Sequence, residues 1–289
     1  MRALDPEVKD TVWQAISALI PVPLDTHPLG RHRRRKSNRD CFEVMLVRLV
    51  TGCSFEDAER LCGNKVSDTT VRSRRDEWIE AGVYEAMAAE ALAAYDRIVG
   101  LDLSDVAVDG SQHKAPAGGE GTGKNPTDRA KLGWKWSVLT DRNGIPIGWA
   151  IDGANRHDSV LLPATLAAAA GRGLLEDIET IWLDRGYDSG TVRAELTASG
   201  LGDAVIAKKR KAGTTKSAPA PRQPMGLRWP VERTNSWLSN FGALRRNNSR
   251  KVAHRLAELA LAVAFLLTAK LIDWRNRWSL DCVPIRLAP

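Results

Sequence analysis

The sequence has 289 residues, of which 43% are hydrophobic and 27% charged, a composition that is typical of a globular protein and excludes a disordered chain. The formal net charge of +7 favours a polyanionic partner, with a basic protein that lacks such a partner as the alternative. The most apolar run, "LALAVAFLLTA" at 259–269, is too short to cross a bilayer, and the charged first residues predict no signal peptide, so we expect no membrane partner.

The cysteine spacing bears on the cellular compartment. Cys41, Cys53, Cys62 and Cys282 show no C-x-x-C pairing and no histidine at zinc-finger spacing. This pattern predicts reduced thiols rather than a disulfide framework or a zinc site. We therefore expect a protein of the cytoplasm.

The first forty residues predict a helix followed by a basic segment. Residues 6–20 have the pattern of a short amphipathic helix that ends at "PVP". The run "GRHRRRKSNR" at 30–39 follows, and half of its residues are arginine. Such a run is either a solvated linker or a segment that contacts phosphates. We favour phosphate contact and take Arg33, Arg34 and Arg35 as candidate DNA-binding residues.

Residues 40–97 predict consecutive helices, because apolar residues recur at helical spacing and Ser and Gly mark the ends. A short helix at 54–63, a Gly-Asn turn and a helix from Ser67 have the order of a helix-turn-helix. Three candidate DNA-binding residues lie early on the second of these helices: Arg72, Arg74 and Arg75. A three-helix bundle without a DNA-binding role is the alternative.

From residue 105 the pattern changes to strands. "WKWSVLT" and "PIGWAID" flank "DRNG", which is a good hairpin turn. An Ala/Leu-rich helix follows at 158–171, where Asp158 is interpreted as a cap. A further helix is expected to begin near Asp188, which is predicted to cap it. This order predicts an α/β fold with a mixed five-stranded sheet flanked by helices. The strands are expected at 105–109, 134–140, 146–152, 179–184 and 203–209.

The glycine-rich stretch "GGEGTGKN" at 118–125 nearly matches a phosphate-binding loop. However, Asn125 stands where the magnesium-binding hydroxyl should be, and no strand leads directly into the stretch. A flexible loop that joins two strands is the better interpretation.

Two aspartates fall at predicted strand ends. Asp109 ends the first strand and Asp184 ends the strand "ETIWLD". If these strands are parallel neighbours, the two carboxylates lie close together and repel each other unless a cation lies between them. Oxygen ligands of this kind suit Mg²⁺ or Mn²⁺. For either residue alone, an ordinary turn position is the alternative.

A third carboxylate stands in a strongly basic part of the chain. Between residues 204 and 255 there are thirteen Lys or Arg residues and one acid, Glu232. Glu232 is either paired with Arg228 or Arg233, or it is a metal ligand over a DNA-binding surface, which explains the distribution better. Candidate DNA-binding residues in this part of the sequence are Lys208, Lys209, Arg228, Arg233, Arg245 and Arg246.

Four segments of the sequence together resemble the DDE transposases of bacterial insertion sequences, in particular the insertion-sequence-five family. They are "VAVDGSQHKAPAGGEG", "LGWKWSVLTDRNGIPIGWAIDGANRHDS", "LDRGYDS" and "RWPVERTNSWLSNF". The resemblance covers nearly the whole chain. It implies a ribonuclease-H-like catalytic domain, two Mg²⁺ ions for which Mn²⁺ can substitute, and recognition of terminal inverted repeats. The catalytic, metal-binding triad carries over to Asp109, Asp184 and Glu232, and Asp188 is not part of it.

The sequence departs from the related signature Y-x2-R-x3-E-x6-K at two positions. Met225 stands for the tyrosine and Ser239 for the lysine, whereas Arg228 and Glu232 match. Arg245 or Arg246 can take over the steadying of the terminal phosphate.

The resemblance leads to a definite set of expectations. We expect a helical DNA-binding domain at 1–100, and a catalytic domain at 101–289 that includes the carboxyl-terminal helices. The expected partners are double-stranded DNA, both inverted repeats and target, and further copies of the chain in a homodimer or larger assembly at the bacterial nucleoid. A ribonuclease-H-like nuclease without strand transfer and a non-catalytic helix-turn-helix protein are the alternatives.

Overall fold

The computed structural model describes residues 2–22, 35–202, 204–206, 228–278 and 285–287. The chain forms two compact units. Unit 1 contains residues 1–99 and 238–289, and unit 2 contains residues 100–237.

The amino-terminal part of unit 1 is helical, as the sequence predicts. Ser residues cap three of its helices: the side chain of Ser37 accepts the backbone N–H of Asp40, that of Ser54 accepts Asp57, and that of Ser67 accepts Thr70. The short α3, the turn at 62–67 and α4 confirm the helix, turn and helix expected there. The elements are η1 (Arg2–Leu4), α1 (Pro6–Leu19), α2 (Asn38–Thr51), α3 (Phe55–Leu61), α4 (Asp68–Glu80) and α5 (Val83–Ile98).

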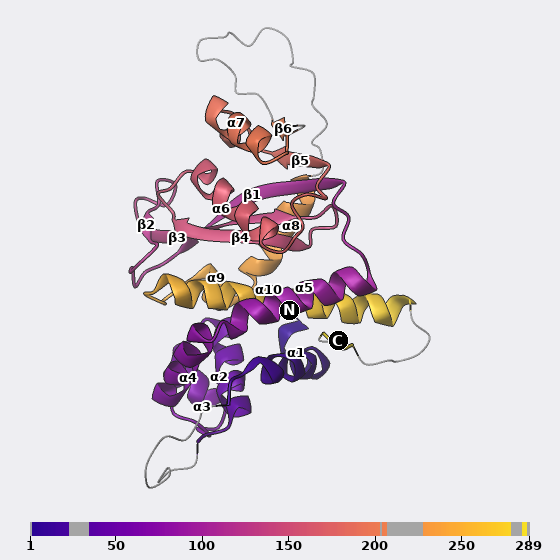
Figure 1. Ribbon diagram of the computed structural model, residues 1–289. Coiled ribbons are helices and arrows are strands. Elements are labelled where there is room, and N and C mark those ends of the chain that lie inside the picture. Colours follow the sequence, from indigo (N-terminus) through magenta and orange to yellow (C-terminus); the bar gives the residue numbers. More distant parts are fainter. Residues whose placement is uncertain (1, 23–34, 203, 207–227, 279–284, 288–289) are drawn as a thin grey trace. The chain divides into compact units, whose positions relative to one another are not determined.

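The carboxyl-terminal helices complete unit 1. They are α9 (Gly242–Arg245) and the long α10 (Val252–Trp278), which lies beside α5 (Figure 1). The end of α2 and the start of α9 meet backbone to backbone, because a Cβ on Gly52 would lie 2.7 Å from the carbonyl carbon of Gly242. The apolar residues of α10 are buried in the core of unit 1, whereas from the sequence we grouped these helices with the catalytic domain.

Unit 2 is built on one mixed sheet. Its hydrogen-bonded order is β2-β3-β1-β5-β6, with β4 also paired to β3. The β1–β3 and β3–β4 pairs are antiparallel, whereas β1–β5 and β5–β6 are parallel. The sheet has six strands rather than the predicted five, because residues of the glycine-rich stretch form the short β2. The strands are β1 (Asp105–Lys114), β2 (Gly123–Lys124), β3 (Leu132–Thr140), β4 (Pro146–Gly153), β5 (Thr180–Leu183) and β6 (Val205–Ile206).

Helices cover the two faces of this sheet. Side chains alternate along β3, so that Lys135 reaches Asp158 on α6 (Asp158–Ala170), whereas Trp136 reaches Asn235 on α8 (Trp229–Ser239). Helix α6 approaches β4 closely at Gly148, where a Cβ would lie 2.7 Å from the carbonyl oxygen of Thr165. The 3-10 helix η2 (Arg185–Tyr187) and α7 (Gly190–Ala198) connect β5 to β6.

The structure also bears on the predictions about membrane-spanning helices and about the cysteines. No helix within the described ranges is long and apolar enough to cross a membrane. Cys41, Cys53 and Cys62 are free thiols, as predicted, and Cys282 lies outside the described residues.

Candidate active site

Asp109 and Asp184 lie at the same level of two neighbouring parallel strands. The last parallel pair between β1 and β5 joins Ala107 to Trp182, and each aspartate comes two residues later. The predicted neighbourhood of the two strands is thus confirmed. Asp109 does not end its strand, however, because β1 continues to Lys114 and pairs Asp109 with Val138 of β3.

The surroundings of Asp109 disfavour its negative charge. Its pKa is raised from 3.8 to about 6, mainly by burial and in smaller part by the nearby carboxylates of Asp158 and Asp184. The guanidinium of Arg228 and the backbone N–H of Gly110 act in the opposite direction. A half-buried carboxylate beside two others is a position at which a bound cation would offset the repulsion.

Asn235 holds Asp109 from the α8 side of the sheet. Its Nδ2 donates to Asp109 Oδ2 at 3.1 Å, and its Oδ1 accepts the indole N–H of Trp136 at 2.8 Å. Both Asn235 and Trp136 are buried. Neither residue was identified from the sequence. Trp136 and Asn235 are 99 residues apart in the sequence, so no local sequence pattern predicts their hydrogen bond.

Glu232 lies on α8, one turn before Asn235. Its side chain is 58% exposed and forms an ion pair with Arg228 at 3.6 Å. Arg228 also lowers the pKa of Asp109, so its positive charge acts on both carboxylates. The sequence-based alternative that Glu232 pairs with Arg228 is therefore realised, and Glu232 shares a helix with the residue that binds Asp109.

The turn after β5 assigns different roles to its two aspartates. Asp184 caps η2 by accepting the backbone N–H of Gly186. Asp188 forms an ion pair with Arg193 at 2.9 Å, and the side chain of Ser189 caps α7. The expectation that Asp188 caps this helix is wrong, because Ser189 Oγ already accepts the N–H of Val192 at 3.2 Å.

A buried lysine and a buried tyrosine lie on the α6 side of the sheet. Lys135 is 1% exposed and donates to Asp158 Oδ1 at 2.7 Å. Burial raises the pKa of Tyr187 well above its usual value, and the carboxylates of Asp158, Asp109 and Asp184 add to the rise. A single lysine within the apolar "WKWSVL" strand was the signal that could have identified this pair.

The role of Asp158 differs from the prediction. The cap of α6 is His157, whose Nδ1 accepts the backbone N–H of Ser159 at 3.3 Å. Asp158 instead lies against Gly110, where a Cβ would come within 2.3 Å of its Oδ1. Glycine at position 110 thus leaves room for this carboxylate next to Asp109.

A ready-made metal cage is absent from the part of the chain that the structure describes: no three Asp, Glu, His or Cys side chains there lie close enough to hold one ion. Asp109 and Asp184 are neighbours, whereas Glu232 turns towards Arg228. The structure brings two members of the predicted triad together and places the third on the adjoining helix.

The three arginines of α4 that were predicted to bind DNA differ in how far they are buried. Arg72 is exposed and pairs with Asp68 at 3.0 Å. Arg74 and Arg75 are only 3% and 8% exposed, so the prediction that they face DNA does not fit the structure. Arg74 donates a hydrogen bond to Asn38 Oδ1 at the start of α2.

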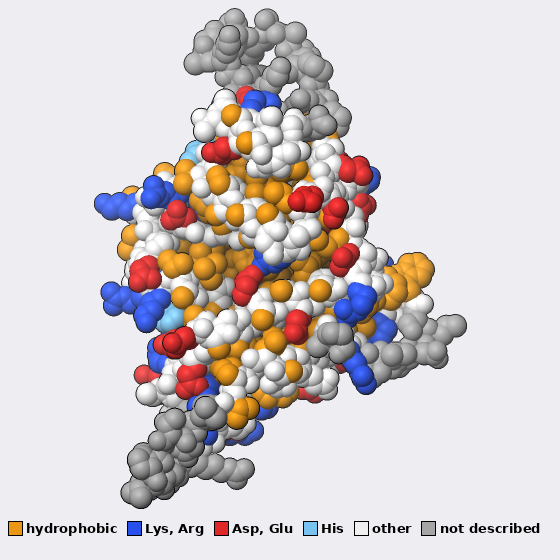
Figure 2. Space-filling view, viewed as in Figure 1, with side chains coloured by type: hydrophobic (Ala, Val, Ile, Leu, Met, Phe, Trp, Pro, Cys, Tyr) orange, Lys and Arg blue, Asp and Glu red, His pale blue; other side chains and the backbone are white. Residues whose placement is uncertain are grey.

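The remaining residues that were predicted to bind DNA differ in how far their side chains are exposed or already paired. Arg35 is half-buried and paired with Glu77, and Arg233 lies between the rings of Trp229 and Trp237. Figure 2 shows Lys and Arg side chains interspersed with Asp and Glu on the face in view. The residues Arg33, Arg34, Lys208 and Lys209 lie outside the described residues.

Arg245 and Arg246 are exposed and begin a basic segment, residues 245–251, which also carries exposed Arg250 and Lys251. Between these cations, Asn247 and Ser249 are buried. The sequence does not reveal this alternation, because Asn and Ser are ordinarily surface residues.

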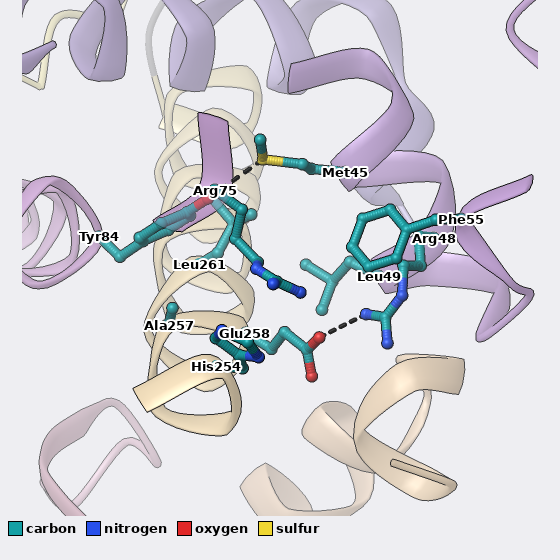
Figure 3. Close-up of a pocket in the computed structure, with 10 residues that line it drawn as sticks. All are labelled: Met45, Arg48, Leu49, Phe55, Arg75, Tyr84, His254, Ala257, Glu258 and Leu261. Atoms are coloured by element: carbon teal, nitrogen blue, oxygen red, sulfur yellow. Dashed lines mark hydrogen bonds and ion pairs between the residues drawn. The ribbon is translucent and has the colours of Figure 1, made fainter. Parts of the chain in front are cut away.

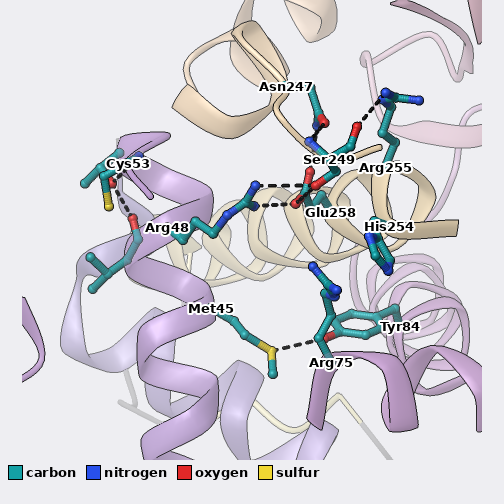
Figure 4. A network of polar contacts seen from close by, with 12 residues as sticks. Met45, Arg48, Cys53, Arg75, Tyr84, Asn247, Ser249, His254, Arg255 and Glu258 are labelled. Atoms are coloured by element: carbon teal, nitrogen blue, oxygen red, sulfur yellow. Dashed lines mark hydrogen bonds and ion pairs between the residues drawn. The ribbon is translucent and has the colours of Figure 1, made fainter. Parts of the chain in front are cut away.

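Glu258 of α10 anchors the basic segment from inside unit 1 (Figure 4). It accepts hydrogen bonds from Asn247 at 2.6 Å and from Ser249 at 2.9 Å, and it forms an ion pair with Arg48 of α2. All four residues are buried. The segment is thus held in one conformation that points its cations outwards.

A small space adjoins this network (Figure 3). Met45, Phe55 and Tyr84 line its apolar side, and His254 and Glu258 its polar side. Its volume is about 20 Å³, which is room for one water molecule. It is a packing gap rather than a ligand site.

Two protein families match the sequence of this chain. The family described as "Transposase DDE domain" matches residues 100–268, and the family described as "Putative transposase of IS4/5 family" matches residues 8–88. The chain belongs to the DDE transposases of insertion sequences. Its mixed sheet with flanking helices is consistent with the ribonuclease-H-like fold expected of that family.

Two relatives from Burkholderia cepacia agree with this placement. One is named "Putative transposase for insertion sequence element IS402" and is 40% identical over 138 residues, which are 45% of this chain and 60% of the relative. The other, "Insertion element IS402 uncharacterized 16.2 kDa protein", is 33% identical over 123 residues, 42% of this chain and 82% of the relative. The chain therefore spans less than two thirds of the first relative's length.

Proposed function

We propose that this transposase binds the terminal inverted repeats of an insertion sequence, cuts the DNA there and joins the ends to target DNA. The observation that carries the proposal is the placement of Asp109 and Asp184 side by side on parallel strands, with α8 bonded to Asp109 through Asn235. Glu232 on the same helix supplies the third carboxylate.

The donor set fits a divalent cation, Mg²⁺ or Mn²⁺. Burial and neighbouring carboxylates raise the pKa of Asp109 to about 6, and a cation would relieve that repulsion. Asp109, Asp184 and Glu232 would hold two such ions through oxygen atoms. Bound ions would activate the attacking water or 3′-hydroxyl and stabilise the charge on the leaving oxygen.

Arg228 has a role that follows from its position. It pairs with Glu232 and lies close enough to Asp109 to lower the pKa of that carboxyl. One cation thereby serves both acids when the site is free of DNA. A phosphate in the site would be a second anion for the same guanidinium, which can bind it through two N–H groups.

The basic segment 245–251 is the best-supported DNA contact of unit 1. Its exposed Arg245, Arg246, Arg250 and Lys251 alternate with anchored polar residues, so their cationic ends are available without a cost of ordering the backbone. Arg72 on α4 adds an exposed cation at the predicted recognition helix. Two element ends must meet in one complex, so we expect a homodimer or larger assembly on DNA.

A cleavage and joining assay tests this function. Full-length protein, end DNA and Mg²⁺ should give cut ends that become joined to a plasmid, whereas Asp109→Asn, Asp184→Asn and Glu232→Gln should abolish cutting and keep end binding. Asp188→Asn is the matched control, because Asp188 lies in the same turn but pairs with Arg193. Full activity of Asp184→Asn would overturn the proposal.

The same assay separates the two alternatives. Cutting without joining would indicate a nuclease that lacks strand transfer. Tight end binding by the unaltered protein, with no cutting in Mg²⁺ or Mn²⁺, would indicate a DNA-binding protein without catalysis.

A further inference from the structure

We propose that Asn235 is a positioning residue for Asp109, and that Trp136 fixes the orientation of the Asn235 amide. The inference rests on the proposed catalytic role of Asp109. It adds two residues, one on β3 and one on α8, that touch neither DNA nor the reacting atoms.

The hydrogen bonds allow one orientation of the amide. An indole nitrogen can only donate, so the amide oxygen of Asn235 must face Trp136, at 2.8 Å. The NH₂ group is then directed at Asp109 Oδ2, at 3.1 Å. A flipped amide would set two donors against each other at Trp136 and two acceptors at Asp109.

The start of this chain of bonds is rigid. Trp136 is 0% exposed and stacks on His113, with ring centroids 3.7 Å apart and planes at 18°. The ring of His113 is held in turn by Ser111, whose hydroxyl lies 2.8 Å from Nε2. Trp136 therefore offers its N–H in one direction only.

Asn235 couples the helix of Glu232 to the strand of Asp109. Glu232 and Asn235 are three positions apart on α8 and so lie on neighbouring parts of one helix face. Asn235 is 7% exposed, so water has little access to replace its bonds. A fixed amide therefore sets both the direction of one Asp109 oxygen and the distance of α8 from β1.

Trp136→Phe and Asn235→Leu test the chain of bonds. The matched control is Trp134→Phe, because the indole N–H of Trp134 is buried and, among the described residues, has no hydrogen-bond partner. Mn²⁺ affinity of the full-length protein without DNA, measured by electron paramagnetic resonance, is the first readout. The second is kcat and KM for cleavage of end DNA.

Asn235→Leu should weaken Mn²⁺ binding and lower kcat by about 10–100-fold, the usual loss when a residue that supports a metal ligand is removed. KM for DNA should change little, because Asn235 does not reach the surface. Trp136→Phe should give a smaller loss in the same direction, and Trp134→Phe should give none. Since Trp136 acts through Asn235, Trp136→Phe should add nothing in the Asn235→Leu background.

Three outcomes would overturn the inference. They are equal effects of Trp136→Phe and Trp134→Phe, multiplying losses in the double variant, and unchanged Mn²⁺ affinity in Asn235→Leu. If Asn235→Leu fails to fold in a thermal melt, the comparison of the two Trp→Phe variants still decides. Asp109→Asn separates the two proposals: if it cleaves normally the proposed function fails, and if it is inactive while Asn235→Leu behaves as wild type, the positioning role alone fails.

Discussion

Lys135 and Asp158 join the sheet to α6 through one ion pair of 2.7 Å, with the lysine side chain 2% exposed and the aspartate 38% exposed. The ammonium depends on this carboxylate, because it lies in the interior. The carboxylate has solvent on one side. The two partners are therefore unequal, and their removal should have unequal effects.

Asp158→Ala should lower the free energy of unfolding by about 3 kcal/mol, because it leaves a buried ammonium without its carboxylate. Lys135→Met should cost less than half as much, since it removes the buried charge and keeps most of the volume. Urea unfolding of both variants and of the double variant measures this. A larger loss for Lys135→Met than for Asp158→Ala would contradict the assignment of Lys135 as the dependent partner.

Asp109 should make the metal-free protein less stable as pH rises. Its folded pKa of about 6 lies above the ordinary 3.8, so the stability present at pH 4 is lost as pH rises through 6. Asp109→Asn should therefore raise the free energy of unfolding at pH 8 by on the order of 1–2 kcal/mol, and by little at pH 4.5. Thermal melts in a chelator measure the difference.

The control for this prediction is the cation itself. Mn²⁺ should raise the melting temperature of the wild type at pH 8, because it binds the folded state, and it should leave Asp109→Asn unchanged. An equal loss of stability in Asp109→Asn at both pH values would show that the carboxylate is needed for packing rather than for charge.

Glu258→Ala should strongly destabilise unit 1, because it leaves the side chains of Arg48, Asn247 and Ser249 without their shared acceptor in the interior. We expect a loss of about 3–5 kcal/mol in denaturant unfolding. Glu56→Ala is the control, since Glu56 is 67% exposed and its ion pair with Arg60 should contribute under about 1 kcal/mol. Similar losses in the two variants would contradict the network.

Arg245→Ala combined with Arg246→Ala should weaken DNA binding on all sequences alike. Each lost phosphate contact reduces the slope of log affinity against log salt by about 1, so the double variant should lose about 2. Arg74→Ala should leave the slope unchanged and lower stability, because Arg74 is buried. Fluorescence anisotropy at several salt concentrations measures the slopes, and an unchanged slope in the double variant would exclude these residues as phosphate contacts.

The sequence predicted those parts of the fold that depend on local patterns. The serine-capped helices of unit 1 and the hairpin between β3 and β4 follow from cap and turn residues, and the hairpin turn is held by Asp141, which accepts the N–H groups of Asn143 and Ile145. The neighbourhood of Asp109 and Asp184 followed from the direction of their strands. Each of these rests on residues close in sequence or on a general rule of sheet topology.

Contacts between distant segments could not be predicted in this way. Two examples are the hydrogen bond from Trp136 to Asn235 and the packing of α10 against α5. Sequence periodicity does not show which distant residues or helices will be partners in such contacts. The burial of Arg74 and Arg75 had a readable signal, since they share a helix face with apolar Val71 and Trp78 at spacings of three, four and seven. The assumption that arginine faces solvent overrode that signal.

The return of the carboxyl-terminal helices to unit 1 affects the order in which the chain can fold. During synthesis, the amino-terminal helices leave the ribosome long before α10, whose apolar residues fill their shared core. Unit 2 is complete first, so it can fold while its neighbour still exposes apolar surface. A fragment that ends at residue 100 would lack that core, so the helical unit should be isolated only with residues 238–289 supplied in the same or a second polypeptide.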